Sequence, residues 1–479
     1  MSSLPKSTIQ GITMPLSDQA PNMTEEMGQS SLTAEISPKQ KHSKKLQVLI
    51  VVAAFTINFT ACGLLYGFGV YQAHYETMAL EKATPFTGAS PAEIDLIGSL
   101  SNSVMNLGAP FAVAWAKNWN AHLVICAGGL LYGIASVLAS FGTALWHFQL
   151  TQGFLLGVAT CLSLMCSMTV VPTWFDRHRA LAMGIISSGT GIGGLVWAPA
   201  LRYCIDQMGF RNTLRLTGVI AAVFMFAAGC VIGWEPSMAA QLHAENEGAS
   251  WVTKLCRIPL PDWKTAKQRK FIAQALGTAL QSAAYATPVF FLASYAKTLG
   301  YNDVDGANFT AVSNASNAIG KIAAGFIADR VGRLNAFFLT TFLSTGVTMG
   351  LWVPSTIVGT SNKGVGRSLF IAFTVLYSIF ASPYVSLFPA TLVELFGVSQ
   401  LPRVAGIMYM MQGVGAIIGT PVAGVLIKDS KTARSSDDYT GMAILVGGLL
   451  FATTVMVAWV RIEAAKSHTG EKRQRKWKL

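Results

Sequence analysis

Apolar runs of about 20 residues follow one another along almost the whole chain, and they restrict its fold more than any other feature. A bilayer core of about 30 Å requires a helix of this length. We count twelve such runs, over residues 47–72, 93–115, 122–141, 147–173, 180–200, 213–234, 271–296, 307–328, 335–355, 368–391, 403–427 and 440–461. The sequence therefore predicts an all-α polytopic membrane protein with twelve transmembrane helices.

The composition excludes a soluble globular protein. Only 12% of the residues are charged and 52% are hydrophobic, so too little polar surface is available to coat a water-facing globule. A net charge of +12 is also typical of nucleic-acid binding, but basic residues collect in the cytoplasmic loops of membrane proteins. We therefore expect a lipid bilayer as partner and no nucleic acid.

A long polar stretch divides the twelve runs into two groups of six. We expect a disordered cytoplasmic tail over 1–46, six-helix bundles over 47–234 and 271–461, a cytoplasmic central loop over 235–270, and a basic cytoplasmic tail over 462–479. With both termini inside, the inner segments hold 24 Lys and Arg and the outer loops hold 10. This bias places both termini in the cytoplasm.

One cation, Lys321, lies inside an apolar run, eight residues before Asp329. That distance is about 12 Å of helix, twice the reach of a lysine side chain. An ionisable residue within a span usually faces a bundle interior or a watery cavity. Thr310, Asn314, Asn317 and Lys321 are spaced by four, three and four, which places them on one helix face. We interpret this polar stripe as the binding surface of a transporter.

Other polar residues within the spans are candidates for the same cavity. Asn102 and Asn106 are four residues apart and make another polar face, and Gln281 and Tyr285 are polar or amphipathic residues of a later helix. For Asn314 and Asn317, hydrogen bonding between helices is as simple an interpretation as ligand binding. Asn308 opens an Asn-Phe-Thr sequon at an outer helix start, so it is a candidate glycosylation site.

An internal repeat supports the division into six and six. A shift of 222 residues overlays Gly184 on Gly406, Gly191 on Gly413, Gly193 on Gly415 and Pro199 on Pro421. A shift of 212 overlays Gly108, Ala112 and Ala116 on Gly320, Ala324 and Ala328. The glycines are first of all packing positions that let helices approach closely. Two parallel repeats of this kind are typical of transporters whose halves are related by an axis along the membrane normal.

Several motifs together resemble the major facilitator superfamily, and within it the monocarboxylate porter family of fungal type, over about residues 46–462. The motifs are Gly325-Phe-Ile-Ala-Asp-Arg-Val-Gly-Arg333 after the eighth span, Trp174-Phe-Asp-Arg-His-Arg-Ala-Leu-Ala-Met-Gly184 before the fifth, Tyr66-Gly-Phe-Gly-Val-Tyr71 and Pro288-Val-Phe-Phe-Leu-Ala-Ser-Tyr-Ala296. The resemblance implies two six-helix repeats and alternating access.

The resemblance also implies roles for residues of these motifs. In porters of the family, the eighth helix carries an aspartate and, four residues later, an arginine. The resemblance implies that these two residues act as a pair in substrate and proton binding. Here these positions are Lys321 and Asn317, and a lysine that some members carry on the first helix aligns near Tyr66. A lysine still binds a carboxylate, as a point charge. Asn317 does not titrate, so proton coupling is left as a hypothesis in which a desolvated Lys321 itself loses its proton between cycles.

The loop after the eighth span is the expected gate. Asp329 is suited to cap a helix end and to pair with Arg330 or Arg333, which would latch the cytoplasmic side. The equivalent loop after the second span is Lys117-Asn118-Trp119-Asn120 and lacks the Asp-Arg pair. We therefore expect an asymmetric latch that is weaker in the first half.

These features predict a transporter that moves a small organic anion, a monocarboxylate, across the plasma membrane. Two alternatives stay open: efflux of a fungal secondary metabolite, and a transporter-like substrate sensor. The spans contain no paired carboxylates, Ser–base pair or HExxH pattern, so an enzyme is not expected. The histidines show no ligand spacing and the seven cysteines no CxxC pattern, so neither a metal site nor a cofactor is expected.

Overall fold

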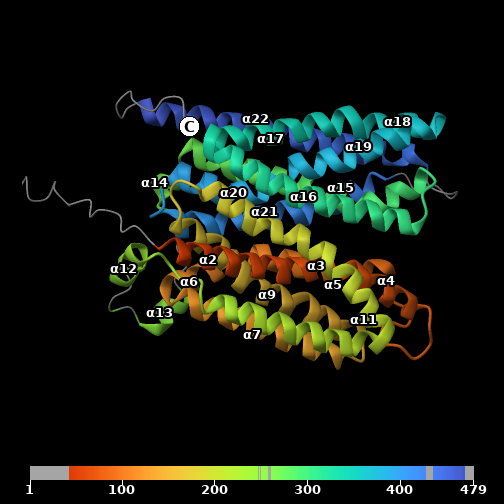
Figure 1. The fold of residues 1–479 in the computed structure, drawn as a ribbon, viewed down its shortest axis with the longest axis horizontal. Helices are drawn as coiled ribbons and strands as arrows, with labels where there is room; N and C mark the ends of the chain where they lie inside the picture. Colours follow the sequence, from red (N-terminus) through yellow and green to blue (C-terminus); the bar gives the residue numbers. More distant parts are fainter. Residues whose placement is uncertain (1–42, 246–247, 249, 257–259, 428–434, 470–479) are drawn as a thin grey trace, which may run out of the picture. The chain divides into compact units, whose positions relative to one another are not determined.

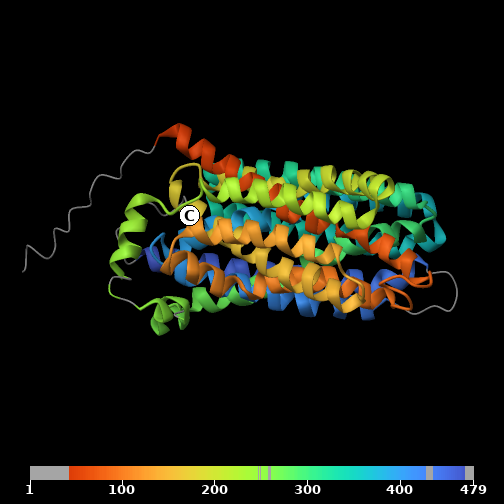
Figure 2. The same ribbon diagram turned by 90° about the horizontal axis from the view of Figure 1, so that it is seen from below.

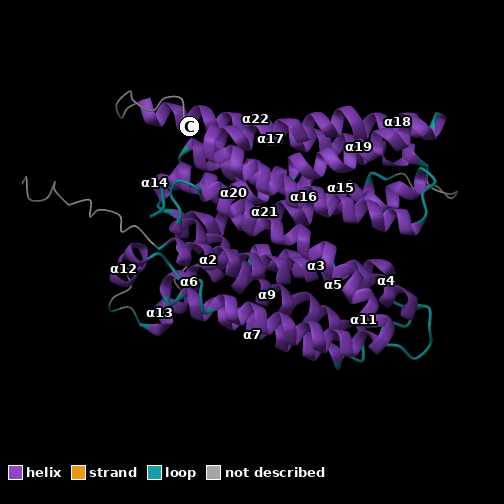
Figure 3. Ribbon diagram, viewed as in Figure 1, coloured by secondary structure: helices purple, strands orange, loops and turns teal. Residues whose placement is uncertain are grey.

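In a computed structural model, residues 43–245, 248, 250–256, 260–427 and 435–469 are described. The described residues from 44 on make up one compact unit. Most of the expected N-terminal tail, and the C-terminal residues from 470 on, lie outside the described residues. Every regular element in the described part of the chain is a helix (Figure 3).

The first half of the unit, residues 44–234, contains the first six spans. Its elements are α2 (Lys44–Ile57), η1 (Asn58–Cys62), α3 (Gly63–Tyr66), α4 (Phe68–Ala79), α5 (Pro91–Leu107), α6 (Ala109–Asn118), α7 (Ala121–Ser140), α8 (Leu145–Phe148), η2 (Gln149–Leu155), α9 (Leu156–Thr160), η3 (Cys161–Met165), α10 (Cys166–Val170), η4 (Val171–Trp174) and α11 (Arg179–Gly229). Three short helices follow, namely α12 (Pro236–Glu245), α13 (Trp251–Cys256) and α14 (Trp263–Ala266).

The second half, residues 269–469, contains the other six spans. Its elements are α15 (Arg269–Thr298), α16 (Asp303–Val331), α17 (Arg333–Val347), η5 (Thr348–Trp352), α18 (Val353–Ser361), α19 (Lys363–Ala381), α20 (Pro383–Phe396), α21 (Leu401–Val425), η6 (Ser436–Tyr439) and α22 (Thr440–Thr469). The helices of the two halves run along the same long direction (Figures 1 and 2). Helices α12, α13 and α14 lie together at one end, called here the α12 end, and α4 and α18 lie at the other (Figure 1).

Several of these elements join into single spans. Eight of the described helical stretches are long and apolar enough to cross a membrane, and one of them, α11, is 51 residues long. Gly209 divides α11 into two spans, because its φ of 76° is left-handed and ends the first helix. The more polar pair α5–α6, together with α15 and α16, completes the twelve spans that the sequence predicts.

The second part of α11 is tied to the end of α7 by two arginines. Arg211 donates to the carbonyls of Ser140 and Gly142, and Arg215 Nε donates to Ser140 Oγ at 2.9 Å. Cations near a helix C-terminus satisfy its last carbonyls and oppose its dipole. These two arginines therefore have a structural role in holding α11 against the end of α7.

The repeat seen in the sequence reappears in the contacts between the halves. A Cβ at Gly406 of α21 would lie 2.8 Å from Pro110 Cα, and one at Gly184 of α11 would lie 3.4 Å from Ile322 Cα. Ile322 follows Pro110 by the second shift of the repeat, 212 residues. Gly413 beside Asn106 and Gly191 beside Ala318 repeat the relation. The seam between the halves, formed by α11 with α16 and by α5–α6 with α21, is therefore built twice on one plan.

Candidate functional site

Lys321 lies in α16 and points across the seam toward α11. Its side chain is only 2% exposed, so it faces neither lipid nor bulk water. The ammonium donates to Ser187 O at 3.1 Å and to Thr190 Oγ1 at 2.5 Å. No carboxylate of the described residues forms an ion pair with it. A buried cation held only by neutral oxygens retains much of its desolvation cost, which is several kcal/mol per ion.

The polar stripe on α16 does not form one wall. Asn314 lies beside Gly194 of α11, on the side that Lys321 also faces. Asn317 instead donates from Nδ2 to the hydroxyl of Tyr285 on α15 at 3.1 Å. Positions 314 and 321 are two helical turns apart and point within about 20° of each other, whereas 317 is rotated by about 60° from 314 and about 40° from 321 at 3.6 residues per turn. The stripe therefore divides between α11 and α15.

A group of neutral polar side chains lies on the α15 side of this division. Gln281 is 1% exposed, and neither atom of its amide has a hydrogen-bond partner among the described residues. Asn317 Oδ1 and the hydroxyl of Tyr409 are also buried without a partner there. Buried polar groups are nearly always paired with protein or with water. These atoms are therefore available to form hydrogen bonds with a polar ligand or with ordered water.

Tyr66 reaches this group from the first half. It lies within range of electrostatic interaction with Tyr285 and Cys62, and Cys62 in turn lies within that range of Lys321. The Tyr285 ring is 6.1 Å from that of Tyr384, centroid to centroid. Tyr66, the last residue of α3, is 46% exposed although it lies within the first span, so it borders an accessible space. Tyr66, Gln281, Tyr285, Asn317 and Lys321 thus lie around one region of the structure.

Two sequence-predicted residues make no contact with these side chains in the described part of the structure. Asn102, on α5, is half-buried and accepts at its backbone oxygen from Asn106 Nδ2, whose side chain contacts Gly413 at the seam. Asn308 is exposed in the second turn of α16, and the hydroxyl of Thr310 donates to Gly306 O within the same helix. Glycosylation at Asn308 stays a prediction.

The carboxylate of Asp329 caps the start of α11 across the seam. Its Oδ1 accepts from Ala180 N at 3.1 Å and its Oδ2 from Leu181 N at 2.8 Å. These amides are in the first turn of α11, where backbone N–H groups have no intrahelical partner and the helix dipole attracts negative charge. A residue of the second half thus supplies the cap for a helix of the first half.

The two arginines beside Asp329 have different contacts. Arg333 pairs with Asp329 at 3.3 Å and donates to Asp176 O of the first half at 2.8 Å. Arg330 is exposed and lies over the ring of Phe326, 4.0 Å from its centroid. Glu394 of α20 lies within electrostatic range of Arg333 and Arg179. The described cross-seam contacts of this loop are therefore made by Asp329 and Arg333.

A second charged link across the seam involves α12. Glu245, the last residue of that helix, accepts from Lys117 Nζ at 2.7 Å and from Arg403 at 3.3 Å. Lys117 ends the second span and Arg403 begins the eleventh. Among the described residues, the hydrogen bonds that link the two halves lie from the level of Lys321 to the α12 end. The structure is therefore closed at that end.

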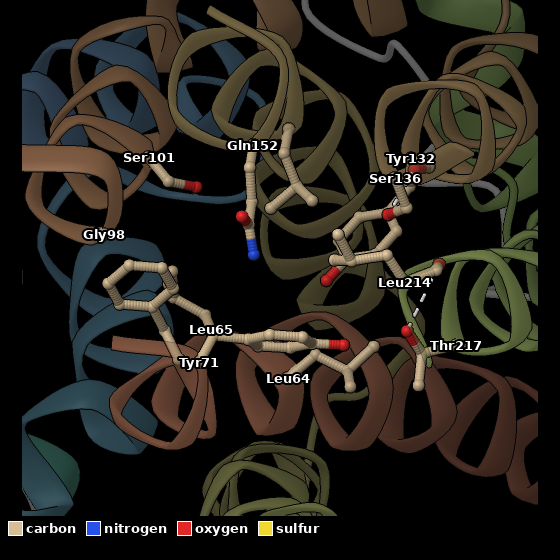
Figure 4. Close-up of a pocket in the computed structure, with 12 residues that line it drawn as sticks. Leu64, Leu65, Tyr71, Gly98, Ser101, Tyr132, Ser136, Gln152, Leu214 and Thr217 are labelled. Atoms are coloured by element: carbon tan, nitrogen blue, oxygen red, sulfur yellow. Dashed lines mark hydrogen bonds between the residues drawn. The ribbon is translucent and has the colours of Figure 1, made fainter. Parts of the chain in front are cut away.

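A separate cavity lies inside the first half (Figure 4). Its polar lining consists of Tyr71, Ser101, Tyr132, Ser136, Gln152 and Thr217. Gln152 Oε1 accepts from the hydroxyl of Tyr75, while Ser101 Oγ has no partner among the described residues. None of the described residues that line this cavity is charged, and Lys321 and the residues grouped around it are not among them.

The comparison with known protein families agrees with this architecture. The family model described as Major Facilitator Superfamily matches residues 48–366 and 364–479. The chain belongs to the major facilitator superfamily. Members of this superfamily are transporters and not enzymes, so the chain is a multi-pass membrane transporter with two six-helix repeats.

Individual major facilitator proteins resemble the chain over nearly its whole length. It is 26% identical to the agnestins efflux protein of Paecilomyces divaricatus, over 94% of this chain and 95% of that protein. It is 27% identical to monocarboxylate transporter 11 of Homo sapiens, over 84% of this chain and 82% of that protein. The proton:xylose symporter XylE shares the fold, with a TM-score of 0.66 at 13% identity, over 88% of this chain and 97% of that one.

Sequence reasoning missed three residues of this major facilitator structure. Ser187 and Thr190, which hold Lys321, are three residues apart on the helix face that also carries Gly184 and Gly191. The repeat therefore contained a signal for them, because those glycines mark the face turned toward α16. Glu245 has no sequence signal of this kind, because its two partners are more than a hundred residues away on either side.

Proposed function

We propose that this transporter moves a small organic anion, a monocarboxylate, by alternating access, and that Lys321 supplies the charge that attracts it. One observation carries the proposal: a buried ammonium lies between the halves with only neutral oxygens as partners. A carboxylate that replaced Ser187 O and Thr190 Oγ1 would give this ammonium the counter-charge it lacks.

The position of Lys321 on the seam links this exchange to the transport cycle. Its two hydrogen bonds join α16 to α11, so they must break when the halves separate. At that moment the ammonium loses its protein partners, and an anion that enters the space bordered by Tyr66 would take their place. The unpaired amide of Gln281 would donate to and accept from the remainder of the substrate, and the unpaired Oδ1 of Asn317 would accept from it.

The test is transport into vesicles with a panel of labelled monocarboxylates. Lys321→Gln should abolish uptake, because a neutral amide attracts no carboxylate, and Lys321→Arg should retain it. Lys363→Gln, at the exposed first residue of α19, is the matched control and should transport as the unaltered protein does. Full transport by a folded Lys321→Gln protein would refute the anion site.

Efflux of a larger secondary metabolite is the second candidate, favoured by the aromatic character of the same region. Tyr66, Tyr285 and Tyr384 present rings beside the unpaired amide of Gln281, a combination that suits a planar hydroxylated compound. The two candidates differ in substrate size. A deletion strain that accumulates a metabolite, while short monocarboxylates are not transported, would favour efflux. Tagging the protein in that strain would also test the plasma membrane as its location.

A further inference from the structure

We propose that Glu245 is the gating carboxylate of the first half, supplied by α12 in place of the acid that the loop after the second span lacks. It would keep the α12 end closed and would release Arg403 when that end opens. The proposal depends on alternating access and is independent of the substrate.

The internal repeat shows which acidic position of the second half has no acidic counterpart in the first half. A shift of 212 residues places Asp329 on Lys117, and a shift of 222 places Leu181 on Arg403. In the α11–α16 part of the seam, Asp329 binds directly to the amide of Leu181. In the α5–α6 and α21 part, the equivalent positions are both cations, and like charges at close range repel each other.

Glu245 lies between these two cations. It accepts from Lys117 Nζ at 2.7 Å and from Arg403 Nη2 at 3.3 Å with each of its oxygens. One carboxylate therefore converts a repulsive pair into two attractive ones. Asp262, just before α14, adds a weaker contact to Arg403 at 3.8 Å.

The anchoring of α12 indicates which contact must break. Trp234, just before α12, donates to Ala116 O at 2.8 Å, and Asn118 donates to Lys254 O at 2.9 Å. Both contacts attach the α12–α13 segment to the first half, as does the short bond from Lys117. Arg403 is the partner that belongs to the second half. We expect α12 to move with the first half, so that the Glu245–Lys117 bond persists and the Glu245–Arg403 bond opens in each cycle.

Cross-linking tests this order directly. A bifunctional thiol reagent that joins Glu245→Cys to Arg403→Cys should abolish transport, and one that joins Glu245→Cys to Lys117→Cys should leave the transport rate unchanged relative to the same double variant without reagent. Transport that continues through the 245–403 link would overturn the proposal. Loss of transport caused by the 117–245 link would overturn it equally.

Accessibility tests the closing role. Ala405, buried in α21 beside Gly406, is replaced by cysteine in a background without other cysteines, and its labelling is followed from the cytoplasmic side. Glu245→Gln should raise the labelling rate about threefold or more, since each partly exposed ion pair contributes modestly. Glu463→Gln, which removes an ion pair within α22, is the matched control and should not change it.

A double variant separates a gating role from a merely structural one. Lys117→Glu restores an acid at the position equivalent to Asp329. Combined with Glu245→Gln, it should return the labelling rate toward that of the unaltered protein. An unchanged labelling rate in Glu245→Gln, or no recovery in the double variant, would refute the role of Glu245.

Discussion

Asp329 and Leu181 belong to opposite halves of the protein, and the carboxylate of the first accepts from the backbone amide of the second at 2.8 Å. The contact joins the last turn of α16 to the first turn of α11. Because it uses a backbone N–H of a helix start, it depends on the position of the helix and not on the side chain at 181. It can form only when the two helices are together at the α12 end.

Asp329→Asn should weaken closure at the α12 end. The amide keeps the shape of the side chain but removes the charge that interacts with the helix dipole and with Arg333. A loss of about 1–2 kcal/mol is expected for a charge at a partly buried helix start. Labelling of a cysteine at Ala405 by a reagent supplied at the α12 end should therefore accelerate about fivefold or more. An unchanged rate would mean that Asp329 only stabilises the fold.

Gly406→Ala should force the seam apart. The added methyl would lie 2.8 Å from Pro110 Cα, which is backbone and cannot turn aside. Overpacking of this kind costs about 1–3 kcal/mol. The expected results are a lower melting temperature in detergent and a loss of transport. Gly346→Ala is the matched control, since nothing lies within 4 Å of that position, and both measurements should be unaffected.

Thr190→Val should destabilise the closed state through Lys321. Valine keeps the volume of threonine but removes the hydroxyl that accepts from the ammonium, and hydrogen bonds to charged groups contribute about 1.5–3 kcal/mol. Thr190→Ser retains the acceptor. Melting temperatures should therefore be lower for the valine variant than for the serine variant. Equal values would show that Ser187 O alone suffices to hold Lys321.

The Glu245 link should be insensitive to pH near neutrality and fail in acid. The hydrogen bond from Lys117, with the charges of Lys117 and Arg403, lowers the pKa of Glu245 below its ordinary value. A carboxylate with a lowered pKa stabilises the closed state fully at pH values above the pKa of a free carboxyl. This stabilisation is lost as the pH falls through the lowered pKa. His243, on the same helix, and Asp262, beside Arg403, are the other titratable groups nearby.

The measurement is the cytoplasmic labelling rate of the cysteine at 405 as a function of pH, corrected for thiolate ionisation with a free thiol. Between neutral pH and the ordinary carboxyl range the corrected rate should be flat, and it should rise below that range. Glu245→Gln should remove the rise. A rise centred near neutral pH would assign the change to a histidine instead.

The sequence predicted the part of the architecture that depends on local composition. The apolar runs determined the twelve helices, and the spacing of glycines at 184, 191, 406 and 413 indicated the repeat that the seam contacts then displayed. Burial of Lys321 was also predictable, because its distance from Asp329 exceeds the reach of its side chain. Helix ends, such as the extension of α4 to Ala79, were not.

The partners of the charged residues were decided only by the tertiary structure. The sequence left Arg330 and Arg333 as equal candidates for Asp329, and packing at the seam selected Arg333. From the sequence, Lys321 was expected to face a cavity. In the structure, α11 packs against α16 and supplies Ser187 O and Thr190 Oγ1 as hydrogen-bond acceptors for the ammonium.

By itself, then, this sequence determined that the chain crosses a membrane twelve times in two related halves, because hydrophobicity and glycine spacing act within a helix and are written in neighbouring residues. Only the folded structure decided which groups meet across the seam. Glu245 between Lys117 and Arg403 is the clearest case. Electrostatic contacts depend on distance in space, and Arg403 of the second half lies 3.3 Å from Glu245 because the two halves meet at the α12 end.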